Sequence, residues 1–195
     1  MATVAANYIE DKALREKVKK GLLYVGLASI AMMFISLTSA YIVRVKVGDW
    51  TYFELPRQLY FSTTAIILSS ITMIWAVKAS WQNKFNHVLG GLALTLLLGL
   101  VFSYFQVKAW GNLVEQGVFL AGSKSNVAGG FLYILSGLHL LHLAAGIIAL
   151  LVALFKAKNR KYTSENNLGL RLVAIYWHFL DILWVYLFVF LIYIH

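Results

Sequence analysis

The sequence predicts an all-α polytopic membrane protein, with five transmembrane helices in one bundle. Of its 195 residues, 61% are hydrophobic and 13% are charged, whereas a soluble domain carries about 25% charged residues. The apolar residues are also collected into runs of about twenty, the length at which a helix crosses a hydrocarbon core of ~30 Å. The charge and the apolar runs together exclude an ordinary soluble domain.

Five spans are expected, at residues 21–43, 59–80, 87–110, 127–155 and 172–194. The first twenty residues are polar and contain no apolar signal region, so the first span should be an uncleaved anchor behind a cytoplasmic segment. Pro56 comes shortly before the second span, where proline favours a helix start. Glycines recur in the later spans and let helix backbones approach closely. We expect residues 1–195 to form one membrane domain whose spans pack on one another or on a partner.

The basic residues predict which way the chain crosses the membrane. Residues 1–20, 78–86 and 156–171 hold five, two and five Lys and Arg, whereas residues 44–57 and 108–124 hold three and two. Because cytoplasmic loops carry the excess of Lys and Arg, the N-terminus is expected in the cytoplasm and His195 outside. The net charge of +9 therefore serves orientation and contact with anionic lipid, and no nucleic-acid partner is expected.

Asp181 is the only acidic residue inside any expected span. A carboxylate at membrane depth costs about 2.5–3.5 kcal/mol and is usually paired or functional. His178 precedes it by three residues, and His139 and His142 have the same spacing in the preceding span, so each pair shares a helix face. The helical rise places all four groups at neighbouring depths on consecutive antiparallel helices. We therefore expect a buried, hydrogen-bonded structural cluster of His139, His142, His178 and Asp181.

The same histidines could instead hold a metal or a haem iron. Only one buried acid accompanies them and the chain has no cysteine, so we expect no catalytic, cofactor-binding or metal-binding residue on this chain. Gln106, late in the third span, is expected to make an interhelical hydrogen bond. Several hydroxyls of the second span should bond to their own helix backbone, namely Ser62, Thr63, Ser69 and Ser70.

Three stretches carry a resemblance to a known family. Tyr176-Trp177-His178-Phe179-Leu180-Asp181-Ile182-Leu183-Trp184 resembles the last-helix motif of subunit III of haem-copper cytochrome oxidases. Ser136-Gly137-Leu138-His139-Leu140-Leu141-His142, with Gly146, resembles that family's TGFHxxHxxxG pattern. Residues 162–169 are similar to its TSExHxG turn, with Asn167 at the second His of the fuller FTSEHHFG form. The register continues through residues 68–76 and 94–106, so the resemblance covers about residues 20–195.

The resemblance implies the short, five-helix bacterial form of cytochrome c oxidase subunit III. That subunit is an accessory part of an aerobic respiratory oxidase in the bacterial inner (plasma) membrane. It stabilises the catalytic subunit, holds phospholipids and supports proton uptake for proton-pumping oxygen reduction. It carries no haem or copper, which are expected on partner subunits. The implied partners are subunit I as the main contact, subunit II, small subunits or a larger supercomplex, and membrane lipid.

Other functions remain open at this point. Subunit III of a quinol oxidase and the accessory protein of nitric oxide reductase are closely similar, and a stand-alone histidine-ligated membrane metalloprotein or a lipid-binding scaffold belongs to a different class. The sequence also departs from the family. Ile30 follows Ser29 where members often have a buried glutamate, and Lys108 lies where an acid often follows the glutamine. A proton-antenna role for those acids is therefore not transferred to this chain.

Overall fold

The computed structural model describes residues 2–46, 55–120, 127–164 and 166–194, with side chains from residue 13 onward. These residues form five helices, with no strand among them: α1 (Ala2–Val45), α2 (Gln58–Trp81), α3 (Phe85–Glu115), α4 (Val127–Lys158) and α5 (Leu168–Ile194). Each is long and apolar enough to cross a membrane. The predicted all-α, five-span fold is confirmed. The sidedness of the N-terminus and the single-domain assignment stay predictions.

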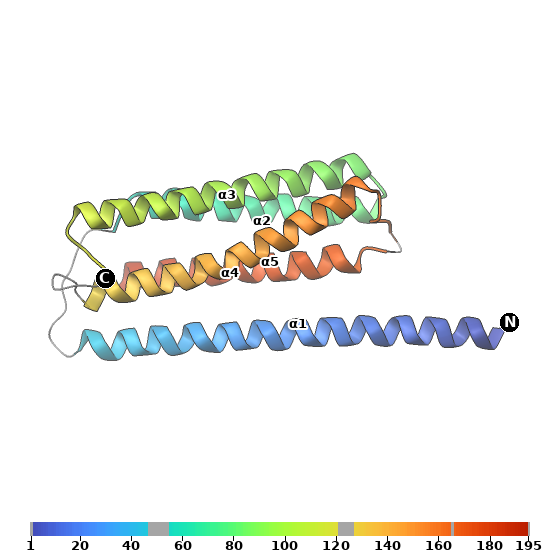
Figure 1. The fold of residues 1–195 in the computed structure, drawn as a ribbon, viewed down its shortest axis with the longest axis horizontal. Helices are drawn as coiled ribbons and strands as arrows, with labels where there is room; N and C mark the ends of the chain where they lie inside the picture. Colours follow the sequence, from blue (N-terminus) through green and yellow to red (C-terminus); the bar gives the residue numbers. More distant parts are fainter. Residues whose placement is uncertain (1, 47–54, 121–126, 165, 195) are drawn as a thin grey trace.

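The helices lie roughly parallel to one axis (Figure 1). The pair α2 and α3 lies along one edge, α4 and α5 occupy the middle, and α1 lies along the opposite edge. Within the described residues α1 packs only on α4 and α5. It begins at the opposite end of the bundle from the one where α5 ends, as an odd number of crossings requires.

Helix α1 is much longer than the expected first span. Its 44 residues correspond to about 66 Å of helix, roughly twice the thickness of a hydrocarbon core. The segment expected to be polar and cytoplasmic is thus helical from Ala2 and continuous with the span. Figure 1 shows its N-terminal part running past the ends of the other helices.

A short turn joins α2 to α3 and makes them an antiparallel pair. Asn83 in this turn has a positive φ of 54°, and the Lys84 amide donates to the Ala79 carbonyl at 3.1 Å. The two backbones then approach closely at Gly91. A Cβ placed on Gly91 would lie 2.8 Å from the Cβ of Ala76, so only glycine fits this crossing.

The centre of the bundle is the indole of Trp177 on α5, which is 0% exposed. Its ring packs on Gly99 of α3 and Gly146 of α4, where an added Cβ would come within 2.7 Å and 3.3 Å of the ring. Its Nε1 donates to Ser69 Oγ of α2 at 2.9 Å. One side chain therefore contacts α2, α3 and α4. Because lipid supplies no hydrophobic drive between helices, such close packing and hydrogen bonding hold them together.

A smaller share of helix α1 than of α5 is buried. In its most apolar part 17% of the residues are buried, against 44% in α5. A single stripe does the packing, formed by Leu27, Phe34, Thr38 and Tyr41. The Phe34 ring meets the His142 ring edge-on with centroids 5.9 Å apart, and Tyr41 meets Phe131 and Phe190 in the same way. Outside this stripe, many large apolar side chains of α1 are exposed, among them Leu22, Val25, Met32 and Ile35.

Candidate functional site

Three hydrogen bonds join α2 to α5, and we call the six residues that form them the α2–α5 seam. Trp184 Nε1 donates to Thr63 Oγ1 at 3.0 Å. Trp177 Nε1 donates to Ser69 Oγ at 2.9 Å. Ser70 Oγ and His178 Nδ1 are 2.6 Å apart. Interhelical hydrogen bonds are worth about 0.6–2 kcal/mol each in membranes, so the seam fixes the position of α5 against α2.

The hydroxyls of the seam explain why polar residues occupy an apolar helix. Thr63 Oγ1 donates to the Leu59 carbonyl and Ser69 Oγ donates to the Ile66 carbonyl, both at 2.7 Å. Ser62 also donates to Leu59, which confirms the expected bonding to the own helix for these three residues. Each oxygen of Thr63 and Ser69 then accepts an indole N–H, because a hydroxyl both donates and accepts. Ser70 differs from the expectation, since its bond crosses to α5.

Asp181 lies next to the seam, beside His178. The Nδ1 of His178 and the Oδ2 of Asp181 are 3.8 Å apart, and the two side chains are 27% and 6% exposed. Neither carboxyl oxygen of Asp181 has a hydrogen-bond partner among the described residues. The pair is an ion pair only when His178 is protonated, and a buried charge without its partner is strongly destabilising.

The other two histidines of the expected cluster lie apart from this pair. His139 is fully buried between the rings of Phe102 and Trp184, at centroid distances of 5.7 Å and 5.0 Å. Its ring nitrogens have no hydrogen-bond partner in the described part of the chain. His142 Nδ1 bonds to the Leu138 carbonyl of its own helix at 2.7 Å. His139 thus packs toward α3 and α5 while His142 meets α1, so the structure brings only His178 and Asp181 together.

Gln106 is 1% exposed. Its amide nitrogen and oxygen have no partner among the described residues, and hydrogen bonds between α3 and α4 are made one turn farther along α3. There, Trp110 Nε1 donates to Ser136 Oγ at 3.0 Å, and Tyr133 Oη donates to the Trp110 carbonyl at 3.3 Å. The interhelical bond expected of Gln106 is supplied here by a tryptophan.

A second polar contact joins two connections at one end of the bundle. The Ser164 amide donates to Asn83 Oδ1 at 2.8 Å, and Asn83 Nδ2 donates to Ser164 Oγ at 3.3 Å. The α4–α5 connection is thereby tied to the α2–α3 turn. Nearby Tyr162 is buried in this connection, and burial raises the pKa of its phenol.

No group of three or more His, Asp or Glu side chains within the described ranges is placed to hold a metal ion. Zinc sites in proteins use at least three protein ligands. The described residues therefore show no ligand group of that kind.

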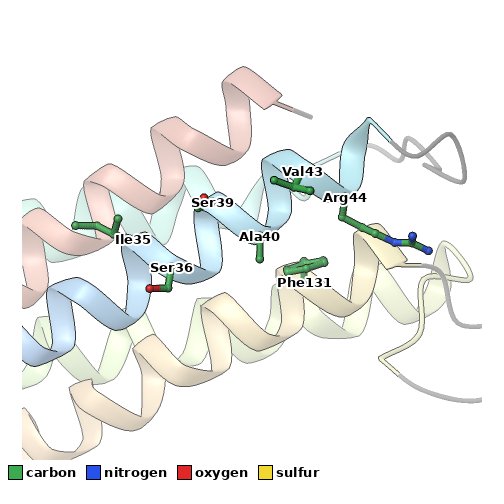
Figure 2. Close-up of a pocket in the computed structure, with 7 residues that line it drawn as sticks. All are labelled: Ile35, Ser36, Ser39, Ala40, Val43, Arg44 and Phe131. Carbon is green, nitrogen blue, oxygen red and sulfur yellow. The ribbon is translucent and has the colours of Figure 1, made fainter.

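Two grooves flank α1. One, with a volume of about 790 Å³, is lined by α1 residues and by Phe131 of α4, and Figure 2 shows Phe131 facing Ala40 across it. The other, of about 290 Å³, lies between α1 and α5 and is lined by apolar side chains with Tyr186. The grooves show that α1 contacts the bundle along its buried stripe and leaves open space on both sides of that stripe.

Sequence reasoning missed the role of Trp177 at the centre of the bundle. The sequence identified Trp177 only as part of a motif beside Asp181 and did not predict that it packs on Gly99 and Gly146. The available signal was a tryptophan in one span together with glycines in two others, because small residues mark the places where a neighbour packs closely. Asn83 was missed too, although an asparagine in a tight connection favours positive φ.

Comparison with known proteins gives a consistent result. The family model described as cytochrome c oxidase subunit III matches residues 10–195. Cytochrome c oxidase subunit 3 of Aedes aegypti is 33% identical over 69% of this chain and 49% of its own length. The Rhipicephalus sanguineus protein of that name is 32% identical over 71% and 51%.

The bacterial relative from Corynebacterium diphtheriae, also named cytochrome c oxidase subunit 3, is 32% identical over 73% of this chain and 69% of its own length. The chain thus spans about half the length of the two animal relatives and more of the bacterial one. Because the family model covers nearly the whole chain, the chain belongs to the cytochrome c oxidase subunit III family.

Proposed function

We propose that this chain is the accessory subunit III of a bacterial haem-copper cytochrome c oxidase. It stabilises the catalytic subunit, holds phospholipid and supports proton uptake for proton-pumping oxygen reduction. The observation that carries the proposal is the family match over residues 10–195. Haem and copper are held by partner subunits, and this chain contributes neither a catalytic centre nor a ligand to one.

The architecture fits a stabilising role. The interior of the α2–α5 part is filled by large side chains such as Trp177 and Trp184, which leaves a rigid body that can be docked as a unit. The outer surfaces of the helices carry many exposed apolar side chains, including Ile67, Ile71, Leu97 and Leu100. In a membrane these surfaces face lipid or another subunit. We expect subunit I to cover part of them, with subunit II, small subunits or a supercomplex as further partners.

The five spans, the bacterial relative and the loop charges support a proposed location. We place the chain in the bacterial plasma membrane with the N-terminus in the cytoplasm. Support for proton uptake cannot involve the family's buried glutamate, because Ile30 stands there and is half-buried against the core. Any support for proton uptake comes from stabilising the structure of the catalytic subunit.

The direct test is to purify the chain, tagged, from its native membrane and identify what accompanies it. We expect subunits I and II, a haem spectrum, and oxygen consumption with reduced cytochrome c. Oxidation of quinol instead would assign the chain to a quinol oxidase, and nitric oxide reduction would assign it to that reductase. Copurification without any haem-copper subunit would contradict the proposal.

A substitution next to the seam separates a structural role from a catalytic one. In Asp181→Asn the charge that faces His178 is lost, and breaking a buried pair costs about 3–5 kcal/mol in soluble proteins. We expect a lower yield of assembled complex, with oxygen consumption per assembled complex unchanged. Yield is measured by the haem content of the purified complex. A variant that assembles fully but no longer reduces oxygen would show that Asp181 takes part in the reaction.

A further inference from the structure

A groove of about 350 Å³ lies between α2 and α5 at the end of the bundle where α2 ends and α5 begins. Lys78 and Trp81 of α2 and Arg171 of α5 line it within one turn of that end. Ile74 and Ile175 line it deeper along the same faces. His178 lies seven residues beyond Arg171, about 10 Å farther into the membrane. The groove therefore runs from a basic mouth into an apolar interior.

The charge at the mouth is of one sign. Among the described residues, the two charged side chains that line the groove are cations, Lys78 and Arg171, and no carboxylate of the described residues lines it. Both are exposed and line the groove together with Trp81, a residue type that favours the headgroup level of a bilayer. Basic pockets between transmembrane helices on the cytoplasmic side bind anionic lipid headgroups. The positive-inside prediction places this end of the bundle on that side.

We propose that this groove binds one anionic phospholipid. Its phosphate lies between Lys78 and Arg171, and one acyl chain follows Ile74 and Ile175 toward His178. The charge of the mouth selects a lipid with a net negative headgroup over a zwitterionic one, since the amine of a zwitterionic headgroup would meet two cations. The apolar walls select a lipid over free phosphate. The proposal rests on the lipid-holding part of the proposed function and gives it a specific site.

The groove also connects the lipid to the seam. His178 is the partly exposed member of the His178–Asp181 pair, and its Nδ1 is held by Ser70 at 2.6 Å. The ring is therefore fixed in place at the inner end of the groove. A bound acyl chain covers this ring, which is partly exposed, as Ser70 is, whereas Asp181 is already buried.

The test is native mass spectrometry of the full chain, in the complex with which it copurifies, titrated with phosphatidylglycerol or phosphatidylcholine of identical acyl chains. We expect one phosphatidylglycerol to be retained in preference to phosphatidylcholine. Lys78→Gln with Arg171→Gln should weaken its binding about 30-fold, because each basic side chain near the surface contributes about a factor of five. Ile175→Trp, which fills the groove without changing charge, should also weaken binding.

The matched control is Lys84→Gln with Arg160→Gln. These two residues line a separate basic pocket, and the control removes the same two charges from the same end of the bundle. We expect it to leave phosphatidylglycerol binding unchanged. The proposal would be overturned if the control lost as much binding, or if binding were unchanged in the Lys78 and Arg171 variant or in Ile175→Trp. Equal binding of phosphatidylcholine, or displacement of the lipid by inorganic phosphate, would also overturn it.

The lipid site and the proposed function can fail separately. If lipid is lost while the oxidase subunits still copurify, the proposed function stands. If the wild-type chain does not copurify with oxidase subunits, the proposed function is contradicted and the groove is not.

Discussion

Helices α5 and α1 differ sharply in how they are held. Helix α5 places two fully buried tryptophans among α2, α3 and α4, and both indoles donate hydrogen bonds to hydroxyls of α2. Helix α1 is packed through one stripe, and grooves lie on both sides of it. Both helices are long and apolar enough to span a membrane, so hydropathy alone does not distinguish them.

The difference shows what holds a membrane bundle together. Exposed apolar side chains on α1 are stable in lipid, so burying them provides little drive for association. The α2–α5 part instead gains from glycines that admit an indole and from hydrogen bonds that have no water to compete. We infer that α2–α5 form the self-sufficient part of the chain, while α1 keeps most of its surface for lipid or a partner subunit.

The largest expected effect is the loss of the central indole. Trp177→Ala removes a fully buried ring that packs on Gly99 and Gly146, and such a deletion costs about 3–5 kcal/mol in soluble proteins. We expect a fall of that size in the free energy of unfolding, measured in bicelles or nanodiscs. The control is Trp75→Ala, because Trp75 is 45% exposed and its edge-on contact with the His87 ring is worth only about 0.5–1.5 kcal/mol. Equal effects in both variants would refute the distinction between a packed centre and a lipid-facing surface.

A smaller effect is expected from adding a side chain at Gly99, where the Trp177 ring packs on α3. Gly99→Ala places a methyl group within 2.7 Å of the Trp177 ring, and overpacking of this kind costs about 1–3 kcal/mol. The control is Gly90→Ala on the same helix, where nothing lies within 4 Å of an added Cβ. That change should be neutral or stabilising, since alanine is the better helix former. Thermal unfolding of the two variants checks both outcomes, and a neutral Gly99→Ala would mean that the contact is loose.

The sequence was sufficient for features that depend on one helix at a time. Hydropathy located the five spans, and the three-residue spacing of His178 and Asp181 was enough to predict that they lie together, because both belong to α5. It was insufficient for features that depend on how helices are rotated against one another. His139 and His142 have the same spacing, yet the first packs among Phe102 and Trp184 and the second against Phe34. Their separation follows from the placement of α1, α3 and α5 around α4, which no local pattern encodes.

The bond between Ser70 and His178 was unpredictable for the same reason. A serine in a membrane helix ordinarily bonds to its own backbone, and its neighbour Ser69 does so. Which of two adjacent hydroxyls reaches across depends on the rotation of α2 relative to α5. The glycine at position 99 and the indole at position 177 were both visible in the sequence, but their contact became evident only from the packed helices.

The smallest expected effect concerns the one side-chain hydrogen bond between α1 and α5 in the described residues. Thr38 Oγ1 and Tyr186 Oη are 3.0 Å apart, and Tyr186 is 44% exposed, so its hydroxyl has other partners available at the lipid-facing surface. A double-mutant cycle of Thr38→Val and Tyr186→Phe should give a coupling of about 0.6 kcal/mol, the membrane average. The same cycle on Thr63 and Trp184, with Thr63→Val and Trp184→Phe, should give a coupling nearer the upper limit of about 1.7 kcal/mol, because both groups are buried. Ser36→Ala is the control for α1, since Ser36 bonds to the Met32 carbonyl of its own helix and to no other group among the described residues. If the coupling between Thr38 and Tyr186 is as large as the coupling between Thr63 and Trp184, α1 is an integral member of the bundle. The exposed face of α1 could then no longer be assigned to a partner on the ground that α1 is weakly attached.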